Sequence, residues 1–249
     1  MKIAVVAANG RVARKVIAEA LSRGHEVVAF GRHAENNTQA KDYRQKDILD
    51  LTKEDLAGFD AVVDAFGAWT EETLPLHSTT TQHLADILSG TDTRLLIVGG
   101  AGSLYVDPEH NVQLFNTPDF PDAYKPLATA MGKALAGLRE RTDVKWTYIS
   151  PAADFQADGE RTGKYILAGE EFTLNSKNES VISYADYAIA MVDEIEKGPP
   201  HPAAHLRRPR LIPPLLQKIS LKDKIPPTDW HSHSRPGVFT IRRYIVITM

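Results

Sequence analysis

The 249-residue chain contains no cysteine. Disulfide bonds, thiolate metal sites and a cysteine nucleophile are therefore excluded. Histidine does not supply an evident metal site in their place. His231 and His233 are scattered in a proline-rich stretch, and His77 and His83 are six residues apart, which is not a ligand-pair spacing on a helix. We expect no bound metal.

Long apolar runs are also missing. No stretch approaches the roughly 18–20 apolar residues that a membrane-spanning helix needs. The apolar run after Lys2 is too short for a secretory signal peptide and lacks a cleavage-type region. We therefore expect a cytoplasmic protein with no membrane partner.

A strong charge of one sign is absent from the chain as a whole, whose net charge is −3. This value hides an asymmetry, because residues 201–249 hold nine Lys/Arg against two Asp/Glu and seven of the fifteen prolines. The preceding 200 residues hold 20 basic and 30 acidic side chains. The chain thus has an acidic, regularly patterned body and a basic, proline-rich end, and we expect no specific nucleic-acid partner.

The body alternates strand-like and helix-like segments, a pattern typical of a parallel sheet covered by helices. Apolar runs rich in β-branched residues predict strands at 3–6, 26–30, 61–65, 95–98 and 145–149. Amphipathic stretches predict helices at 12–23, 53–56, 79–88, 128–141 and 184–196, with short strands and loops over 159–183. We predict a doubly wound, mostly parallel α/β fold in a single domain over 1–198, with small substrate-side elements near its end.

The connection between the first strand and the first helix predicts a phosphate-binding turn. A helix amino end presents unpaired N–H groups and a positive dipole end, which suit a pyrophosphate. Of the usual glycine fingerprint Gly10 remains, while Ala7 and Ala13 stand where the first and third glycines would be. An ordinary strand–helix connection is the alternative. The cofactor-binding residues predicted here are Ala7, Asn9, Gly10, Arg11 and Val12.

The end of the second strand bears on the choice of cofactor. A carboxylate at this place would bind the adenosine ribose and favour NAD, whereas an arginine accommodates a 2′-phosphate. The sequence has no acid there but has Arg32, and Arg11 is available from the first turn. Arginine suits bidentate phosphate recognition, although two solvated surface arginines are the alternative. We predict NADP(H) as the preferred cofactor, with NAD(H) possible.

Further candidates follow the remaining strands, where folds of this class bind ligands. Asp47 would contact the adenine amino group or cap local backbone. Three glycines in four residues after the fifth strand allow close backbone approach to a ligand, with a flexible loop as the alternative. The proline after Ser150 ends the last core strand in an extended turn. The predicted cofactor-binding residues in this group are Asp47, Ile48, Ala65, Phe66, Gly67, Gly99, Gly100, Ala101, Gly102 and Pro151.

These motifs resemble the atypical short-chain dehydrogenase/reductase superfamily, and within it the NmrA-like NAD(P)H-binding group that includes proteins called NADH-flavin reductases. The similar segments cover about residues 1–198: the turn at 7–12, LLIVGGAGSL at 95–104, WTYISPA at 146–152, GERTGKY at 159–165 and ISYADYAIAMVDEIE at 182–196. The group usually carries Gly-x-x-Gly-x-x-Gly in the turn. Ala7 and Ala13 depart from this pattern and narrow the space for the pyrophosphate, which affects cofactor affinity rather than the fold. The resemblance implies a Rossmann-like fold, a nicotinamide cofactor and reductase activity.

The catalytic motif of many short-chain reductases is absent. No tyrosine has a lysine four residues later, the arrangement that lets the phenol act as a proton donor. Tyr124 stands at the expected place before the last core strand, but its lysine neighbour is Lys125, and adjacent helical residues do not share a face. Tyr124 is therefore a candidate donor or pocket residue, with helix-start packing as the alternative. Ser103 is the second catalytic candidate.

Reduction of a flavin or quinone needs little acid–base catalysis, because positioning dominates hydride transfer. We therefore predict an NAD(P)H-dependent oxidoreductase, monomeric or homodimeric, that reduces a planar small-molecule acceptor, with flavin as substrate rather than bound cofactor. Phe155 or Trp69 would stack on the acceptor or belong to the core. A non-catalytic NADP(H)-sensing regulator is one alternative. An epimerase or carbonyl reductase that uses Tyr124 is another.

The segment 199–249 does not continue the family pattern. It is a disordered basic arm that binds acidic surfaces nonspecifically, an added interaction segment, or non-native sequence such as a shifted reading frame. Residues 238–247 are apolar enough for one strand. We expect a peripheral segment without a catalytic role, so that a chain truncated after Gly198 stays soluble and binds NADPH.

Overall fold

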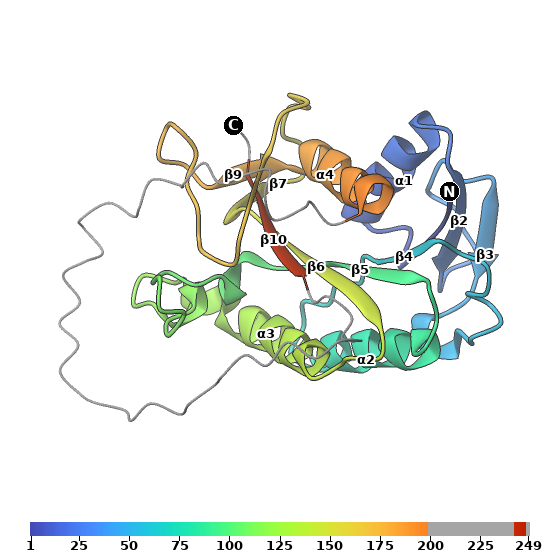
Figure 1. Cartoon of the computed structure of the whole chain (residues 1–249), viewed down its shortest axis with the longest axis horizontal. Coiled ribbons are helices and arrows are strands. Elements are labelled where there is room, and N and C mark those ends of the chain that lie inside the picture. The colour runs from blue at the N-terminus through green and yellow to red at the C-terminus, as the bar shows by residue number, and fades with distance from the viewer. Residues whose placement is uncertain (199–241, 248–249) are drawn as a thin grey trace.

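The computed structural model describes residues 1–198 and 242–247, and it contains one large sheet with two α-helices on each face (Figure 1). The helices are α1 (Arg11–Ser22), α2 (Leu76–Leu88), α3 (Lys125–Arg139) and α4 (Tyr184–Lys197). The strands of the large sheet are β1 (Lys2–Val6), β2 (Glu26–Gly31), β3 (Asp42–Gln45), β4 (Ala61–Asp64), β5 (Arg94–Val98), β6 (Lys145–Pro151), β8 (Ile166–Ala168) and β10 (Arg242–Ile247). A separate two-stranded sheet pairs β7 (Asp154–Gln156) with β9 (Val181–Ser183).

The eight strands lie in the order β3-β2-β1-β4-β5-β6-β10-β8. Neighbouring strands are parallel except for the antiparallel pair of β10 and β8. The predicted doubly wound, mostly parallel fold is confirmed. The strand order reverses between β1 and β4, and in such sheets ligands bind at the carboxyl ends of the strands around this reversal.

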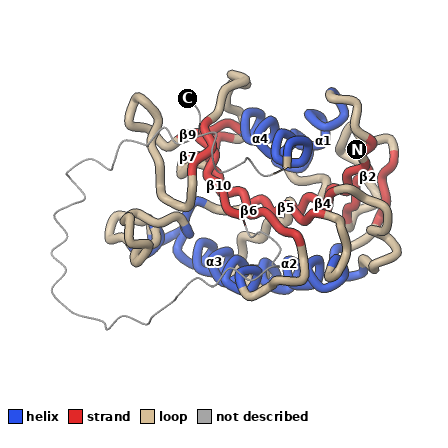
Figure 2. The backbone as a smooth tube through the Cα atoms, in the orientation of Figure 1, coloured by secondary structure: helices blue, strands red, loops and turns tan. Residues whose placement is uncertain are grey.

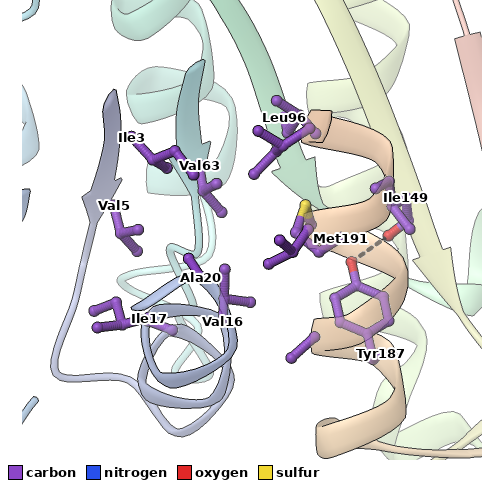
Figure 3. Packing of buried hydrophobic residues seen from close by; sticks show 14 of the residues in the cluster. Ile3, Val5, Val16, Ile17, Ala20, Val63, Leu96, Ile149, Tyr187 and Met191 are labelled. Carbon is purple, nitrogen blue, oxygen red and sulfur yellow. Dashed lines mark hydrogen bonds between the residues drawn. The ribbon is translucent and has the colours of Figure 1, made fainter. Parts of the chain in front are cut away.

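The central strands are buried on both faces, which accounts for their nearly continuous apolar sequences. Ile3 and Val5 contribute to the core beneath α1 and α4 (Figure 3). Ala4 and Val6, which alternate with them, contribute to the core beneath α2 and α3. A fully buried aliphatic side chain stabilises the fold by about 1.5–3 kcal/mol, so both helix layers are held mainly by these two apolar cores.

Polar contacts fix how α1 and α4 lie on the sheet. The hydroxyl of Tyr187 on α4 is fully buried and donates to the Ile149 carbonyl oxygen of β6 at 2.7 Å (Figure 3). Arg23, just after α1, lies 2.6 Å from Asp193 and 2.8 Å from Glu196, both on α4. These contacts hold the two helices side by side over one face of the sheet.

One expected helix is wrong. Residues 53–56 form turns rather than a helix. A carboxylate oxygen of Asp55 accepts from the Thr52 backbone N–H at 2.8 Å, and Gly58 adopts a positive φ of 77° shortly before β4 begins. The chain reverses direction here within too few residues for two helical turns.

The long connections lie at the carboxyl edge of the sheet, where Figure 2 shows mostly loop between β5 and α3 and between β6 and α4. Between β5 and α3 the loop contains three short 3-10 helices, Ala101–Ser103, Leu114–Asn116 and Asp122–Tyr124. A fourth, Ile48–Asp50, follows β3. No helix in the described part of the chain is long and apolar enough to cross a bilayer.

Strand β10 lies within residues 238–247, which the sequence indicates are apolar enough for one strand. It pairs in parallel with β6 from Arg242–Thr147 to Val246–Pro151, and antiparallel with β8. The remainder of 199–249, including His231 and His233, lies outside the described residues. The domain boundary at 198 and the peripheral character of that remainder stay predictions.

The position of β10 changes the expected result of truncation. A chain that ends at Gly198 lacks β10, which leaves β6 at the edge of the sheet and removes the described partner of β8. The unpaired ladder groups each cost about 0.5–1.5 kcal/mol, so we expect the melting temperature to fall by at least about 6 °C. The matched control replaces residues 201–238 with a flexible Gly/Ser linker and keeps the strand, and it should melt close to the full chain. Equal melting temperatures for the truncated and full chains would contradict the pairing.

Candidate functional site

A cavity of about 2040 Å³ opens at the carboxyl ends of the strands. Pockets for one drug-sized ligand are typically about 300–1,000 Å³, so this cavity has room for a dinucleotide and a second molecule. All sixteen predicted cofactor-binding residues line it, and so does Tyr124. Ser103 is not among the lining residues. It is buried, and its hydroxyl donates to the Gly100 carbonyl oxygen at 3.4 Å.

The amino end of α1 faces the cavity and has no side-chain cap. Gly10 is the N-cap residue, and the first turn contains no acidic residue. By contrast, the Ser183 side chain caps α4 by accepting from the Asp186 N–H. The first amides of a helix lack intrahelical partners, and Arg11 and Val12 of this first turn line the cavity. This arrangement suits a pyrophosphate group.

Ala7 adopts a left-handed conformation, with φ of 54°. This is the position at which the related pattern has its first glycine. The conformation places the Ala7 carbonyl oxygen 3.0 Å from the Gly10 N–H that donates to it, which closes the turn between β1 and α1. A left-handed L-residue costs roughly 1–2 kcal/mol. The departure from glycine therefore introduces backbone strain at the edge of the cavity.

The loop after β2 is fastened to this turn. Asn9 donates from its side-chain amide to the Glu35 carbonyl oxygen at 2.8 Å, and its Oδ1 accepts from the Asn37 N–H at 3.0 Å. The Tyr43 hydroxyl donates to the His33 carbonyl oxygen at 2.6 Å. Arg32 lines the cavity, and its Nε lies 3.1 Å from Nε2 of His33. The loop thus holds an exposed guanidinium at the end of β2.

Asp47 performs the capping role that was one of its two predicted alternatives. Its Oδ1 accepts from the Leu49 N–H at 3.1 Å, at the start of the short helix after β3. It also lines the cavity beside Ile48. Contact with an adenine amino group stays a prediction, because the capping bond engages one carboxylate oxygen and leaves the second for another partner.

The glycines after β5 are required by packing within the protein. A Cβ on Gly99 would lie 2.3 Å from the Tyr148 ring, and one on Gly102 would lie 2.8 Å from Cβ of Ala128. Both distances are below van der Waals contact. Sequence reasoning assigned these glycines to ligand approach. The residues do line the cavity, but close contact with β6 and α3 already accounts for two of them.

Two buried titratable residues hold the loop after β4: Asp64, which the sequence analysis did not single out, and His77, which it considered only as a metal ligand. Oδ1 of Asp64 accepts from the Phe66 N–H at 3.0 Å, and its Oδ2 accepts from the Thr81 hydroxyl at 3.3 Å. Burial raises the pKa of Asp64 to about 6. His77 on α2 is also buried, which lowers its pKa, and its Nε2 lies 3.2 Å from the Ala68 carbonyl oxygen. A polar residue at the end of an apolar strand was the available signal for Asp64.

Aromatic side chains from the segments that follow β4, β5 and β6 line the cavity, and we call this set the aromatic wall. Trp69 is 73% exposed and Tyr124 is 57% exposed, although both are large apolar side chains. The rings of Phe155 and Tyr184 lie 4.2 Å apart. Such exposed and accessible rings suit a flat ligand. The residues that form this wall are Trp69, Phe120, Tyr124, Phe155, Phe172 and Tyr184.

Among residues 1–198 and 242–247, no hydrogen bond joins Tyr124 to a lysine. Tyr124 is the N-cap residue of α3, and the ammonium group of Lys125 lies 2.6 Å from Oδ1 of Asp122. The described residues therefore show no Tyr124–lysine hydrogen bond that could replace the Tyr-x-x-x-Lys motif missing from the sequence.

The chain matches one family model and is similar to several known proteins. A family model described as NAD(P)H-binding matches residues 7–197. The chain is 44% identical to the Bacillus subtilis protein YwnB over 199 residues, which are 79% of this chain and 92% of that protein. It is similar in structure to a Streptococcus pneumoniae protein called a "putative NADH-flavin reductase", with a TM-score of 0.82, 44% identity and 100% coverage of both chains. A Bacteroides thetaiotaomicron protein called a "putative epimerase" has a TM-score of 0.73, 29% identity and coverage of 100% of this chain and 97% of its own.

Replacement of Ala7 by glycine should stabilise the protein. Relief of the left-handed strain exceeds the added chain entropy of glycine, so we expect the free energy of unfolding to rise by about 0.5–1 kcal/mol. Ala13→Gly is the matched control, because Ala13 lies within α1 and glycine there should lower stability by about 1 kcal/mol. Urea unfolding measures both. A loss of stability in Ala7→Gly would contradict the strain.

Asp64→Asn should change how stability depends on pH. The folded pKa of about 6 lies above the ordinary pKa of an aspartate. The stabilising contribution of the protonated carboxyl is therefore complete below about pH 4 and is lost as pH rises through 6. The neutral amide avoids this loss. We expect the variant to gain up to about 3 kcal/mol over the parent at pH 8 and nothing at pH 4 in urea unfolding.

Asp143→Asn is the control for this experiment. Hydrogen bonds from Arg141 and Ser89 hold the pKa of Asp143 well below its usual range. The ionised Asp143 carboxylate therefore stabilises the folded protein above about pH 4, and this stabilisation is lost on further acidification. The variant should lose stability at pH 8, and most of that loss should persist at pH 4. A constant difference between Asp64→Asn and its parent over the same range would contradict the buried, pH-dependent role of Asp64.

Proposed function

We propose, from the premise that this chain belongs to the NAD(P)H-binding family, that it is an oxidoreductase that passes reducing equivalents from NADPH to a planar flavin- or quinone-type acceptor. The observation that carries the proposal is the cavity that extends from the uncapped end of α1 to the aromatic wall. Its volume exceeds what one ligand needs. The name of the Streptococcus pneumoniae neighbour supports the reductase activity.

The residues at the β1–β3 end of the cavity fit a dinucleotide. The amides at the start of α1 would hold the pyrophosphate. Glycine suits the turn before them, because a Cβ on Gly10 would lie only 3.3 Å from the Ala7 carbonyl oxygen. Arg32 would bind the 2′-phosphate. Its guanidinium forms no ion pair with another described residue, and no acidic residue follows β2 directly to bind a ribose diol instead.

The residues at the β5–β6 end would position the reaction. Gly100 and Pro151 line the cavity at the ends of two adjacent strands, where the nicotinamide would lie between them. NADPH, when bound, supplies a hydride to the acceptor. The acceptor also takes up one proton, and the open cavity gives it access to water and to the exposed Tyr124 hydroxyl. The protein would contribute mainly orientation and the aromatic surface, which is sufficient for an acceptor whose ring system takes the charge.

A non-catalytic NADP(H) sensor is the second candidate, and the lack of a Tyr124–lysine hydrogen bond among the described residues favours it. The same observation counts against an epimerase or carbonyl reductase that uses Tyr124, because Lys125 pairs with Asp122 instead. A sensor and a flavin or quinone reductase differ in one respect that an assay can measure, since both bind NADPH but only the reductase consumes it.

The test combines turnover with cofactor choice. We expect the protein to oxidise NADPH in the presence of riboflavin or menadione, followed by the loss of nicotinamide absorbance. Because a charged hydrogen bond contributes about 1.5–3 kcal/mol, Arg32→Ala should weaken NADPH binding by roughly 10- to 150-fold and NADH binding by less than about threefold.

Arg14→Ala is the matched control, because Arg14 is an exposed arginine of α1 that does not line the cavity. Equal losses for NADPH and NADH in Arg32→Ala would contradict recognition of the 2′-phosphate. Tight NADPH binding without oxidation would favour the sensor. Failure to bind either cofactor would overturn both candidates.

A further inference from the structure

The charged side chains of the cavity are unevenly distributed along its length. Basic side chains near the dinucleotide end, with the carboxylate of Asp47 beside them, come from the segments after β1, β2 and β3: Arg11, Arg32, His33 and Lys46. Strands β1, β2 and β3 form one side of the sheet. Positive charge therefore gathers where the phosphates of a dinucleotide would lie.

The other end of the cavity is lined by carboxylates. Asp107 and Asp119 come from the loop between β5 and α3, and Asp154 follows β6. Asp107 is held in place, because its two carboxylate oxygens accept from the Asn111 N–H at 2.8 Å and the Val112 N–H at 2.7 Å. Among the described residues, no lysine or arginine lines this end.

Two basic residues of the loop and helix that follow β5 are paired with carboxylates outside the cavity. The ammonium group of Lys125 lies 2.6 Å from Asp122, and the guanidinium of Arg139 lies 2.9 Å from Glu170. Neither basic residue lines the cavity. The amino end of α3 also faces the cavity through Leu127, and the acidic Asp122 just before the helix offsets its partial positive charge.

We propose that the acceptor is an uncharged planar ring compound, such as an unphosphorylated flavin, and that Asp107, Asp119 and Asp154 discriminate against phosphorylated flavins. The inference rests on the proposed reductase function and specifies its substrate class. A phosphate monoester carries about −1.5 to −2 charges at neutral pH. Like charges brought together in a cleft oppose binding, and salt screens the repulsion. The aromatic wall provides affinity for the ring, while the carboxylates select against the phosphate.

Riboflavin and FMN form the matched pair of probes, because they share the isoalloxazine ring and differ by one phosphate. The experiment titrates each flavin with the full chain saturated with NADP⁺ and follows quenching of flavin fluorescence. We expect riboflavin to bind at least about tenfold more tightly at low salt, with the ratio shrinking to about two- or threefold at high salt. This binding measurement needs no turnover.

Two variants test which carboxylates discriminate between riboflavin and FMN. In the double variant Asp119→Asn, Asp154→Asn, the ratio of the FMN dissociation constant to that of riboflavin should fall by about fivefold at low salt. Asp158→Asn is the control, because Asp158 is exposed and lies four residues from Asp154 but does not line the cavity. It should leave the ratio unchanged. Melting temperatures of all variants exclude unfolding as the cause.

Binding and turnover separate the two proposals. Riboflavin preference in the titration supports the inference whether or not NADPH is consumed. FMN binding as tightly as riboflavin at low salt overturns the inference, and so does failure of both flavins to bind. Absence of NADPH oxidation with every acceptor, despite cofactor binding, overturns the reductase function instead.

Discussion

The turn from β1 into α1 is the constraint on which the carboxyl edge of the sheet depends. It lies where the strand order reverses, so it touches the segments after both neighbouring strands. The Ala8 N–H donates to the Phe30 carbonyl oxygen of β2 at 2.9 Å, and Asn9 holds the loop that follows. A Cβ on Gly10 would lie 3.8 Å from the Ala65 carbonyl oxygen after β4. One short turn therefore positions three of the cavity's walls and directs the amides of α1 between them.

Two positions where a glycine would be expected, 7 and 99, differ in whether alanine can take its place. At position 7 the requirement is a backbone angle, which alanine meets at a cost of roughly 1–2 kcal/mol because its side chain stays small. At Gly99 the requirement is space, since the Tyr148 ring occupies the place of a side chain. A missing fingerprint glycine thus weakens the case for a nucleotide site less than the sequence pattern alone indicates. The match of residues 7–197 to the NAD(P)H-binding family agrees with this reasoning.

The sequence predicts the strands and helices whose burial gives them a regular apolar pattern. It does not predict features that depend on contacts between residues far apart in the chain. The apolar runs of β1 and β2 reveal strands buried on both faces, and the carboxyl ends of parallel strands meet at one edge, which gathers the predicted cofactor residues in one cavity. The segment 53–56 misled because four amphipathic residues do not specify a helix. Asp64 acquires its raised pKa from burial beneath α2, and the pairing of β10 with β6 joins residues that are far apart in the chain. Neither the burial of Asp64 nor the β10–β6 pairing can be predicted from a local sequence pattern.

The two ends of the cavity are built from different parts of the chain, which separates what they recognise. The dinucleotide end depends on the β1–α1 turn and the loop after β2. The other end depends on the loop after β5, whose Tyr105 N–H donates to Glu170 and whose Tyr105 carbonyl oxygen accepts from the Phe172 N–H at 2.7 Å. Because these segments are separate in the sequence, substitutions in the second loop change the charge and shape of that end of the cavity without altering the turn that presents the α1 amides. Under the proposed function, the sheet edge combines one cofactor geometry with an acceptor site whose residues vary separately.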